Sequence, residues 1–482
     1  MMRKIIVIAL LQLNVISASA QLKWFSKFGW WGVDIGNDVV ETLDGHYMVT
    51  GYTGSYTFGN SDVMVAKVNK TGWLMWVKNI GGLNNDIGKA IVPTSDSGFV
   101  IAGYTNTYGN GGYDGYLIKV NKTGDLIWQK TYGDTDWDMF NALQQTSDNG
   151  FVMTGYSYSN SKGEKDFWIV KTDSLGNIQW EKKMGGVKDD EFVSVEILHD
   201  GRIACFGTTY SFSDAKGNYC IYKTNNNGDS LFFKEFGTSN AIDIGYDFFE
   251  RPFDSTFIIA GTTQSPFGSD TTYYHILIAD SLCNVIFDIK ESKYNLKNQV
   301  VTTNAYLNNQ KYYVVYDLTG YGQGKREPGF HIFSNQWFLN GNTYGSSEDD
   351  FIVSCKKTSD KGLIAVGYTY GFNALQEDVF IVKSDSTLQY AVNVTGIQQE
   401  QMHTSFYISP NPVWDKMNII FPNIHADAKL FIYDMQGRIL IQMPLQYSRE
   451  SIDVSELQDG IYLISLLTDK QKYTIKFIKA SK

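Results

Sequence analysis

Residues 96–105 read DSGFVIAGYT, and residues 148–157 (DNGFVMTGYS) and 360–369 (DKGLIAVGYT) repeat that decamer with few changes. Each copy opens with an Asp-x-Gly turn, since an Asp side chain bonds its own backbone and Gly accepts a positive φ. A nearly continuous apolar run follows, which is typical of a strand buried on both faces. The recurrence of this hairpin predicts a fold that is built from repeated β units.

The repeat has a period of 52 residues over its first copies. The glycine of the decamer recurs at Gly51, Gly103, Gly155, Gly207, Gly261 and Gly367. A tryptophan keeps the same step at Trp24, Trp76, Trp128 and Trp180. Each unit contains four short β-type runs joined by turns, and four antiparallel strands per unit of this length indicate a blade of a β-propeller.

The predicted fold class is all-β, with a β-propeller over residues 21–396 and a small immunoglobulin-like β-sandwich after it. Seven sets of four runs, between about residues 34 and 396, predict seven four-stranded antiparallel blades, with eight as the alternative. The last blade needs a closing strand, which residues 22–29 or residues 388–394 would supply. We expect the repeated glycines to let neighbouring backbones approach closely, and the repeated tryptophans to fill the gaps between adjacent blades.

The net charge of the chain and its first 20 residues limit the classes of function to be considered. A net charge of −10 argues against a nucleic-acid binder, which needs a basic face. Residues 1–20 have the pattern of a secretory signal peptide, with basic residues, an apolar stretch and a small-residue cleavage site before Gln21. No later stretch is long and apolar enough to span a membrane. We therefore expect an exported protein.

Neither the cysteines nor a search for common catalytic motifs identifies a reactive site in the sequence. Cys205 and Cys220 lie on consecutive predicted strands, so they form either a hairpin disulfide or two buried free thiols. The sequence contains no CxxC pair and no Cys/His cluster. It also lacks the HExxH and GxSxG motifs, so these patterns predict neither a metal centre nor a catalytic nucleophile.

The repeat stops after Gly396, where a polar linker at 397–404 leads into short alternating strands over residues 405–482. This last segment resembles the type A C-terminal sorting domain of the type IX secretion system of Bacteroidota. The resemblance rests on the order and spacing of five motifs. They include Pro410, Asn411, Pro412, Gly437, Gly460, Tyr462 and Lys476.

The resemblance implies a route out of the cell. A sorting domain of this family directs export across the outer membrane through the secretion machinery. A sortase-like protease then often removes it, and the cargo is tethered to surface lipopolysaccharide or released. The alternative is an ordinary immunoglobulin-like adhesion module.

The propeller repeat resembles a second family. The stretch VNKTGDLIWQK, with Asn121, Thr123, Gly124 and Trp128, is similar to the tryptophan-docking repeat of quinoprotein dehydrogenases. That family is usually eight-bladed and binds pyrroloquinoline quinone. The matching residues are packing and turn residues, so the resemblance implies a fold rather than an activity.

One carboxylate per repeat precedes the innermost predicted strand. These residues are Asp34, Asp86, Asp138, Asp190 and Asp350. We expect them around one mouth of the central channel, where a ring of carboxylates would bind a hard cation such as Ca²⁺. The structural alternative is that each Asp accepts backbone N–H bonds and fixes the incoming loop. No other cofactor is predicted.

A second repeated pair has Asp and Lys five residues apart, as in Asp166 and Lys171. Residues at this spacing on a strand point to opposite faces, so we expect no ion pair between them.

The loops at 53–60, 105–112 and 157–163 share Tyr, Ser, Asn and Gly, which suits the binding of glycans or proteins. Ordinary solvated hairpin loops are the alternative. The sequence therefore predicts a secreted or surface-attached propeller that acts as a binding or scaffold module. The alternatives are an extracellular propeller enzyme, quinoprotein-like or glycan-cleaving, and a purely structural surface component. An exposed aromatic patch would favour the binding module, and unrepeated carboxylates at the channel mouth would favour the enzyme.

Overall fold

The computed structural model describes residues 23–388 and 407–479, apart from short gaps. The gaps are at residues 56, 58, 213–215, 239, 252–253, 265–271, 297–300, 303–305, 309–310, 320–325, 335–336, 410–412, 414, 421–427, 435, 446–448 and 468–471. The predicted signal peptide, the linker and the motif at 410–412 lie outside the described residues. Within the described part, no helix is long and apolar enough to cross a membrane.

The chain divides into two compact units, Met1–Thr395 and Gly396–Lys482. In the first unit, consecutive strands pair antiparallel within one sheet before the chain enters the next sheet. The first three sheets are β2 (Asp34–Glu41), β3 (Tyr47–Thr53), β4 (Asp62–Val68) and β5 (Leu74–Ile80); β6 (Asp86–Pro93), β7 (Phe99–Thr105), β8 (Asp114–Val120) and β9 (Leu126–Tyr132); and β10 (Asp138–Gln145), β11 (Phe151–Ser157), β12 (Asp166–Thr172) and β13 (Ile178–Met184).

The later sheets continue this order. They are β14 (Asp190–Ile197), β15 (Ile203–Thr209), β16 (Asn218–Thr224) and β17 (Ser230–Phe236); β18 (Ile242–Glu250), β19 (Phe257–Gln264), β20 (Thr272–Ala279) and β21 (Val285–Leu296); β22 (Val301–Thr302), β23 (Tyr306–Asn308), β24 (Lys311–Thr319), β25 (Arg326–Ser334) and β26 (Trp337–Thr343); and β27 (Asp350–Lys357), β28 (Leu363–Thr369), β29 (Asp378–Ser384) and β1 (Trp24–Phe28).

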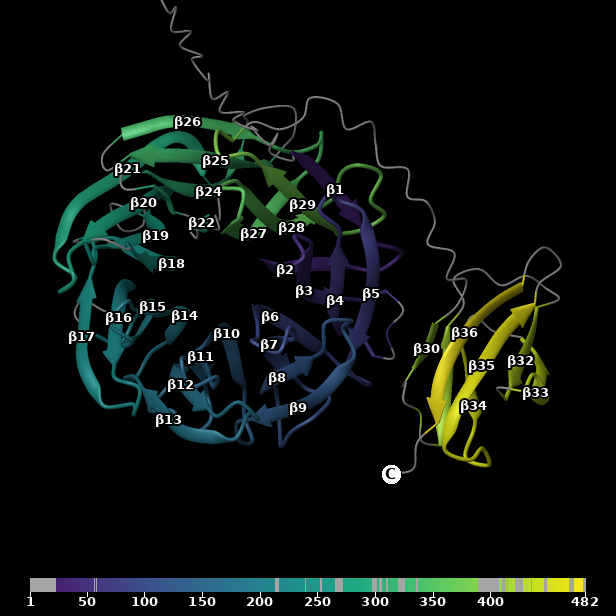
Figure 1. Cartoon of the computed structure of the whole chain (residues 1–482). Coiled ribbons are helices and arrows are strands. Elements are labelled where there is room, and N and C mark those ends of the chain that lie inside the picture. The colour runs from purple at the N-terminus through teal and green to yellow at the C-terminus, as the bar shows by residue number, and fades with distance from the viewer. Residues whose placement is uncertain are drawn as a thin grey trace, which may run out of the picture. The chain divides into compact units, whose positions relative to one another are not determined.

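The sheets of the first unit form a propeller. Figure 1 shows them around a ring, with β2, β6, β10, β14, β18 and β27 toward its centre. Contacts between the first strands of successive sheets agree with this arrangement, from β2 and β6 to β14 and β18. The described residues of this unit form seven sheets. Because the sheet of β22–β26 contains many of the gaps, the number of complete blades stays a prediction.

The N-terminal candidate strand occupies the closing position. β1 pairs antiparallel with β29, with Trp24 opposite Lys383 and Phe28 opposite Val379. The last sheet therefore joins a strand from the beginning of the chain to three strands from its later part. This pairing closes the ring with hydrogen bonds between distant parts of the sequence.

The repeated glycine is required by a bulge in the first strand of the blade. The register between β6 and β7 shifts between Gly88 and Ala90, and the other first strands with described neighbours shift at the same place. A Cβ atom on Gly103 would lie 1.9 Å from the carbonyl oxygen of Ile87. The close approach predicted for these glycines is thus made to the adjacent strand of the same blade.

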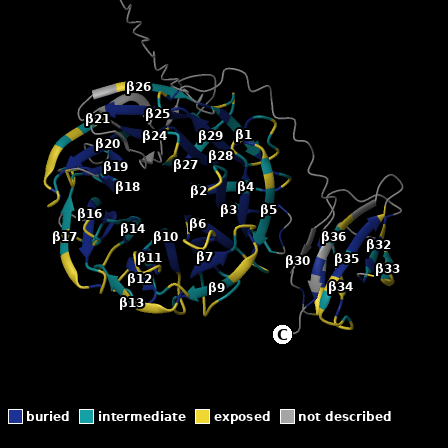
Figure 2. Cartoon of the chain, viewed as in Figure 1, coloured by how far each residue is buried: buried dark blue, intermediate teal, exposed yellow. Residues whose placement is uncertain are grey.

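The apolar core of the propeller lies between the sheets. Figure 2 shows buried residues along the first and middle strands and more exposed residues along the outer strands. All seven residues of β8 are buried, for example, whereas the outer strand β9 has a buried residue only at Tyr132. One cluster joins Trp24 and Met64 to Val366 and Ile381, so neighbouring sheets share their apolar side chains.

The second unit consists of two antiparallel sheets that share one apolar core. The sheets are β30 (Tyr407–Ser409), β31 (Lys416–Ile420) and β34 (Arg449–Asp453), and β33 (Ile439–Pro444), β32 (Lys429–Tyr433), β35 (Gly460–Leu467) and β36 (Lys472–Lys479). Met417 and Ile419 of the first sheet are buried with Leu430, Ile464 and Phe477 of the second.

Four of the motif residues of this unit lie within the described residues. Gly437 has a φ of +80° in the turn between β32 and β33. Gly460 begins β35, and two residues later the Tyr462 hydroxyl donates to the carbonyl oxygen of Gln458 at 2.7 Å. The backbone of Lys476 pairs with Leu463. The motifs therefore specify turns and strand pairing of a small sandwich.

Candidate binding site at the centre of the propeller

A polar cavity of about 480 Å³ lies among the first strands of the blades. Strands β2, β6, β10, β14, β18 and β27 all contribute to its lining. The residues four positions after the start of the repeat unit differ from blade to blade. They are Asp38, Ala90, Ala142, Ser194, Asp247 and Ser354. A cavity whose lining departs from the repeat offers the asymmetry that recognition of one ligand needs.

The carboxylate of Asp38 has hydrogen-bond and ion-pair partners on both neighbouring blades. Its carboxylate accepts a hydrogen bond from the Ser354 hydroxyl at 2.7 Å and from the Ile91 amide at 2.9 Å. Lys356 forms an ion pair with the same carboxylate at 2.8 Å. The negative charge of Asp38 is therefore neutralised within the cavity wall.

Two other carboxyl groups of the cavity, those of Asp247 and Glu196, form no ion pair among the described residues, although the charge of Lys356 acts on both. Asp247 is buried and accepts hydrogen bonds from the Ser194 hydroxyl at 2.7 Å and from the Phe248 amide at 2.9 Å. Burial raises the pKa of Asp247 to about 7. Burial, with Asp247 and Glu250 nearby, raises the pKa of Glu196 to about 8. Within the described residues, Glu196 has neither a hydrogen bond nor an ion pair, and it lines the cavity.

Charged side chains also surround the mouth of the cavity. Lys165 forms an ion pair with Glu191, and Asn141 donates to the same carboxylate at 3.1 Å. The Lys165 ammonium lies 4.6 Å from the ring centroid of Tyr156, which is a cation–π distance. The mouth therefore connects the charged cavity to an aromatic surface.

That surface carries aromatic side chains from successive blades, which we call the aromatic arc. It contains Phe351, Tyr368, Tyr370, Tyr52, Tyr104, Tyr113, Trp137, Tyr156 and Tyr158, all half-buried or exposed. Tyr113 packs edge-on against Tyr104 at 5.3 Å and against Trp137 at 5.4 Å between ring centroids. Trp137 is 48% exposed, so part of the arc faces solvent.

The arc follows the end of the decamer across four blades. Tyr52, Tyr104, Tyr156 and Tyr368 are the tyrosines of its Gly-Tyr step, and the next two blades have Thr208 and Thr262 there. Burial raises the pKa of Tyr52 and of Tyr104 to about 12, so both hydroxyls stay protonated. The decamer itself contained this signal, but sequence analysis assigned binding only to the adjoining loops.

The repeated acidic residues are buried in the blades and do not line the cavity. Asp34 has no exposed surface, and it accepts hydrogen bonds from the Trp30 amide at 2.7 Å and the Ser55 hydroxyl at 3.0 Å. Burial raises the pKa of Asp34 to about 6. Asp86, Asp138, Asp190 and Asp350 accept the corresponding amide bond from the incoming loop.

This geometry matches the loop-fixing alternative for the repeated carboxylates. Among the described residues, no group of three or more His, Cys, Asp or Glu side chains could hold a metal ion. Calcium binding by the ring therefore stays a prediction, and a melting curve with and without EDTA would test it.

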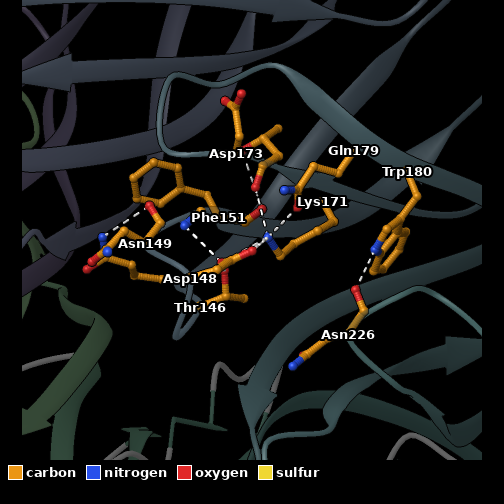
Figure 3. A network of polar contacts seen from close by, with 12 residues as sticks. Thr146, Asp148, Asn149, Phe151, Lys171, Asp173, Gln179, Trp180 and Asn226 are labelled. Atoms are coloured by element: carbon orange, nitrogen blue, oxygen red, sulfur yellow. Dashed lines mark hydrogen bonds and ion pairs between the residues drawn. The ribbon is translucent and has the colours of Figure 1, made fainter.

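The repeated lysine has a partner that spacing alone did not indicate. Lys171 bonds Asp148, in the Asp-x-Gly turn, at 2.9 Å and the amide oxygen of Gln179 at 2.7 Å (Figure 3). Lys67, Lys119 and Lys383 make the same ion pair with Asp44, Asp96 and Asp360. As predicted, Lys171 does not pair with Asp166; its carboxylate partner, Asp148, lies on the adjacent hairpin.

The repeated tryptophans dock on the next blade. The Trp180 indole donates to the carbonyl oxygen of Asn226 at 2.8 Å, as Figure 3 shows, and Trp24 donates to that of Lys70 at 2.9 Å. A Cβ atom on Gly124 would lie 2.5 Å from the Trp76 ring, and Gly124 also has a φ of +76°. The Thr-Gly turn therefore leaves room for the tryptophan of the preceding blade.

The four cysteines are free and buried. Cys220 lies opposite Gly207 and Cys205 lies opposite Tyr222, so the two thiols are not directly paired across the hairpin. Burial raises the pKa of both thiols, which keeps them protonated and unreactive. Of the two alternatives, the structure has the free thiols.

Comparison with known proteins assigns the second unit. A family model described as the secretion system C-terminal sorting domain matches residues 407–480. A sorting domain of the type IX secretion system supports export to the cell surface or the extracellular space. The match covers the small sandwich and leaves the propeller unassigned.

The propeller is similar to known proteins at low sequence identity. Regulatory protein FlaEY of Caulobacter vibrioides is 23% identical over 236 residues, which cover 41% of this chain and 24% of that protein. The β-propeller domain of the Trilobed protease from Pyrococcus furiosus has a TM-score of 0.43 at 10% identity, covering 76% of this chain and 99% of that one. Polysaccharide lyase Uly1 has a TM-score of 0.45 at 11% identity, covering 73% of this chain and 90% of that one. At these values the similarity concerns the fold alone.

Proposed function

We propose that this exported propeller binds glycan chains on the aromatic arc, with the end or a branch of the chain in the central cavity. The aromatic arc is the observation that carries the proposal. Sugar rings have apolar faces that stack on Tyr and Trp, and their hydroxyls bond the polar tips of the same side chains. An aromatic band across four blades suits an extended chain better than a single small molecule.

The cavity supports the same function. Its volume of about 480 Å³ lies in the range of small-ligand sites, and its lining mixes amide, hydroxyl and charged groups. Asn141 and Lys165 lie at the mouth, next to Tyr156. A chain that stacks on the arc would therefore meet hydrogen-bonding groups at one end.

The test is calorimetric titration of the full chain with neutral oligosaccharides, namely cellotetraose, xylotetraose and the tetramer of N-acetylglucosamine. Trp137→Ala should weaken binding by up to about tenfold, since one stacking contact is lost. Trp73→Ala is the matched control, because Trp73 is 46% exposed but lies in the turn between β4 and β5 at the opposite end of the strands. If no saccharide binds, or if both variants bind like the parent chain, the proposal is wrong. Recovery of a surface protein that depends on Trp137 would assign the arc to a protein ligand instead.

A glycan-cleaving enzyme is the second candidate function. The observation in its favour is the pair of unrepeated carboxylates, since glycosidases use two carboxyl groups and raise the pKa of the acid. Glu196, with a pKa of about 8, would be that acid. Chromatography of the oligosaccharides after the titration separates the two functions, because only an enzyme shortens them.

The later steps of export also belong to this proposal. By resemblance, a sortase-like protease removes residues 405–482 outside the cell, and the propeller is then tethered or released. The predicted signal peptide would supply the first step of the route. Intact mass of the protein from culture medium and from washed cells tests both cleavages, because each shortens the chain by a known length.

A further inference from the structure

We infer that the cavity selects a protonated amine, so that the glycans this propeller prefers carry free amino sugars. The inference rests on the proposed glycan function and concerns the chemistry of the cavity. It starts from the charges that the cavity wall leaves unpaired.

Five acidic side chains line the cavity, against three lysines; the acids are Asp38, Asp189, Glu191, Glu196 and Asp247, and the lysines are Lys89, Lys165 and Lys356. Burial lowers the pKa of Lys89, and the acidic group that acts on it is Glu191, at the mouth. Lys356 is taken up by Asp38 at 2.8 Å, and Lys165 is paired with Glu191. Asp247 receives neutral hydroxyl and amide donors, and Glu196 has no hydrogen-bond or ion-pair partner among the described residues. A cationic group of a ligand in the cavity would form ion pairs with these two carboxyl groups.

The groups around Glu196 favour this reading. Asp247 and Glu250 approach it from β18, and Lys356 approaches it from β27. Glu250 already accepts hydrogen bonds from His199, at 2.6 Å from Nδ1 and 2.7 Å from the amide. Among the described residues, the charged groups that act on Glu196 are therefore mostly acidic, and the one cation, Lys356, is shared with Asp38.

The arrangement suits an organic cation better than a bare metal ion. Asp38, Glu196 and Asp247 come from β2, β14 and β18, and within the described residues no three acidic, His or Cys groups converge on one point. A metal ion needs several ligands at one point. An amino sugar fills a cavity of this size, with its hydroxyls on groups such as Asn37 and Asn141 and its ammonium on the carboxylates.

Binding of an amine should also release protons. Burial keeps the pKa values of Asp247 and Glu196 at about 7 and 8, so these groups carry protons in the free protein near neutral pH. An ammonium ion beside them stabilises the carboxylate form. The proton leaves to the buffer, and calorimetry in two buffers of different ionisation enthalpy measures it.

The experiment titrates the full chain at pH 7 with tetramers of glucosamine, N-acetylglucosamine and glucose. The glucosamine tetramer should bind about tenfold more tightly, which is the effect of one charge-assisted hydrogen bond, and it alone should release protons. Glu196→Gln should abolish both the preference and the release. Glu164→Gln is the matched control, because Glu164 is exposed on the loop before β12 and does not line the cavity.

The outcomes separate this inference from the proposed function. Equal affinity for all three tetramers would overturn the inference and leave glycan binding intact. A preference that Glu164→Gln removes as fully as Glu196→Gln would overturn it too, since general surface charge would then explain the effect. Absence of binding by any tetramer would overturn both. Melting curves of the two variants establish that each is folded.

Discussion

The first strand of each blade carries two kinds of residue: repeated residues that hold the blade together, which we call the frame, and residues that line the cavity and vary between blades. A buried aspartate is repeated at the start of the first strand, and its carboxylate accepts hydrogen bonds from the loop that leads into that strand. These residues are Asp34, Asp86, Asp138 and Asp190. Four residues later the acidic residue is not repeated in every blade, and Asp38, Ala90, Ala142 and Ser194 line the cavity. Repetition therefore marks the residues that build the ring and the tyrosines of the aromatic arc, whereas departure from the repeat marks residues that line the cavity.

The largest effect should come from the frame glycine. Gly103→Val should destabilise the propeller by more than about 4 kcal/mol, because the new Cβ atom would overlap the Ile87 carbonyl at the bulge. Gly54→Ala is the control, since the nearest atom to its Cβ would be 3.4 Å away, an ordinary contact. Denaturant unfolding of both variants checks this, and equal stability would show that the bulge can relax.

A docking tryptophan should come next. Trp128→Ala should cost about 3 kcal/mol, at the lower end of the range for large core truncations, because the outer strand leaves Trp128 half-buried. A thermal melt measures the loss. A melting temperature within a degree of the parent would mean that the turn of the next blade does not depend on the indole.

The buried lysine of the hairpin should have a smaller effect. Lys171→Met removes bonds to Asp148, Gln179 and the Thr172 carbonyl, and it should cost about 1–2 kcal/mol. The apolar chain of methionine keeps the packing, so the loss reports the polar contacts. A variant as stable as the parent would show that desolvation of the ammonium cancels its bonds.

The smallest effect should appear in the pH dependence of stability. As the pH rises, ionisation of Asp148 in the blade hairpin stabilises the folded chain, whereas ionisation of Glu196 in the cavity destabilises it. Hydrogen bonds and Lys171 lower the pKa of Asp148 to about 2 against its burial, so its contribution is present above pH 4 and is lost as the pH falls toward 2. Glu196, with a pKa of about 8 in the folded chain, binds a proton that the unfolded chain has released above pH 4.5. Its contribution is therefore present below pH 4.5 and is lost as the pH rises to 8.

Melting temperatures across pH 3 to 9 check both limbs. Stability should be highest near pH 5, and Glu196→Gln should flatten the decline between pH 5 and 8 while leaving the acid limb unchanged. A decline that persists unaltered in Glu196→Gln would assign the alkaline limb to other buried acids, such as Asp34.

Sequence analysis found the frame because the frame is what repeats. The 52-residue step located the strands, the Gly at each bulge and the tryptophans, since each blade meets the same packing problem. The sequence did not decide which strand closes the ring, because both ends of the propeller segment contain a suitable apolar run. Only the pairing of β1 with β29 identifies the N-terminal strand as the closing one. The partner of Lys171 was missed because strand alternation says which face a side chain takes, not what the next hairpin places there.

The candidate site was harder to predict for the opposite reason. Asp38 and Asp247 occupy one position of the repeat that holds Ala or Ser in the intervening blades, and Glu196 lies two positions further along its strand. Only closure of the ring brings the three residues to one cavity. The tyrosines of the arc were visible in the decamer, but a tyrosine beside a glycine on a buried strand also reads as core. Its exposure follows from its place at the end of the strand.

The central claim is that the aromatic arc and the unrepeated residues of the cavity, at one end of the propeller, hold the ligand. Hydrogen exchange of the full chain, with and without a bound tetrasaccharide, tests it most directly. The account predicts added protection in the loops at 106–113, 134–137 and 158–165 and in the inner strand at 190–197. Protection confined to the turns at 69–73 and 121–125, at the opposite end of the strands, would contradict it.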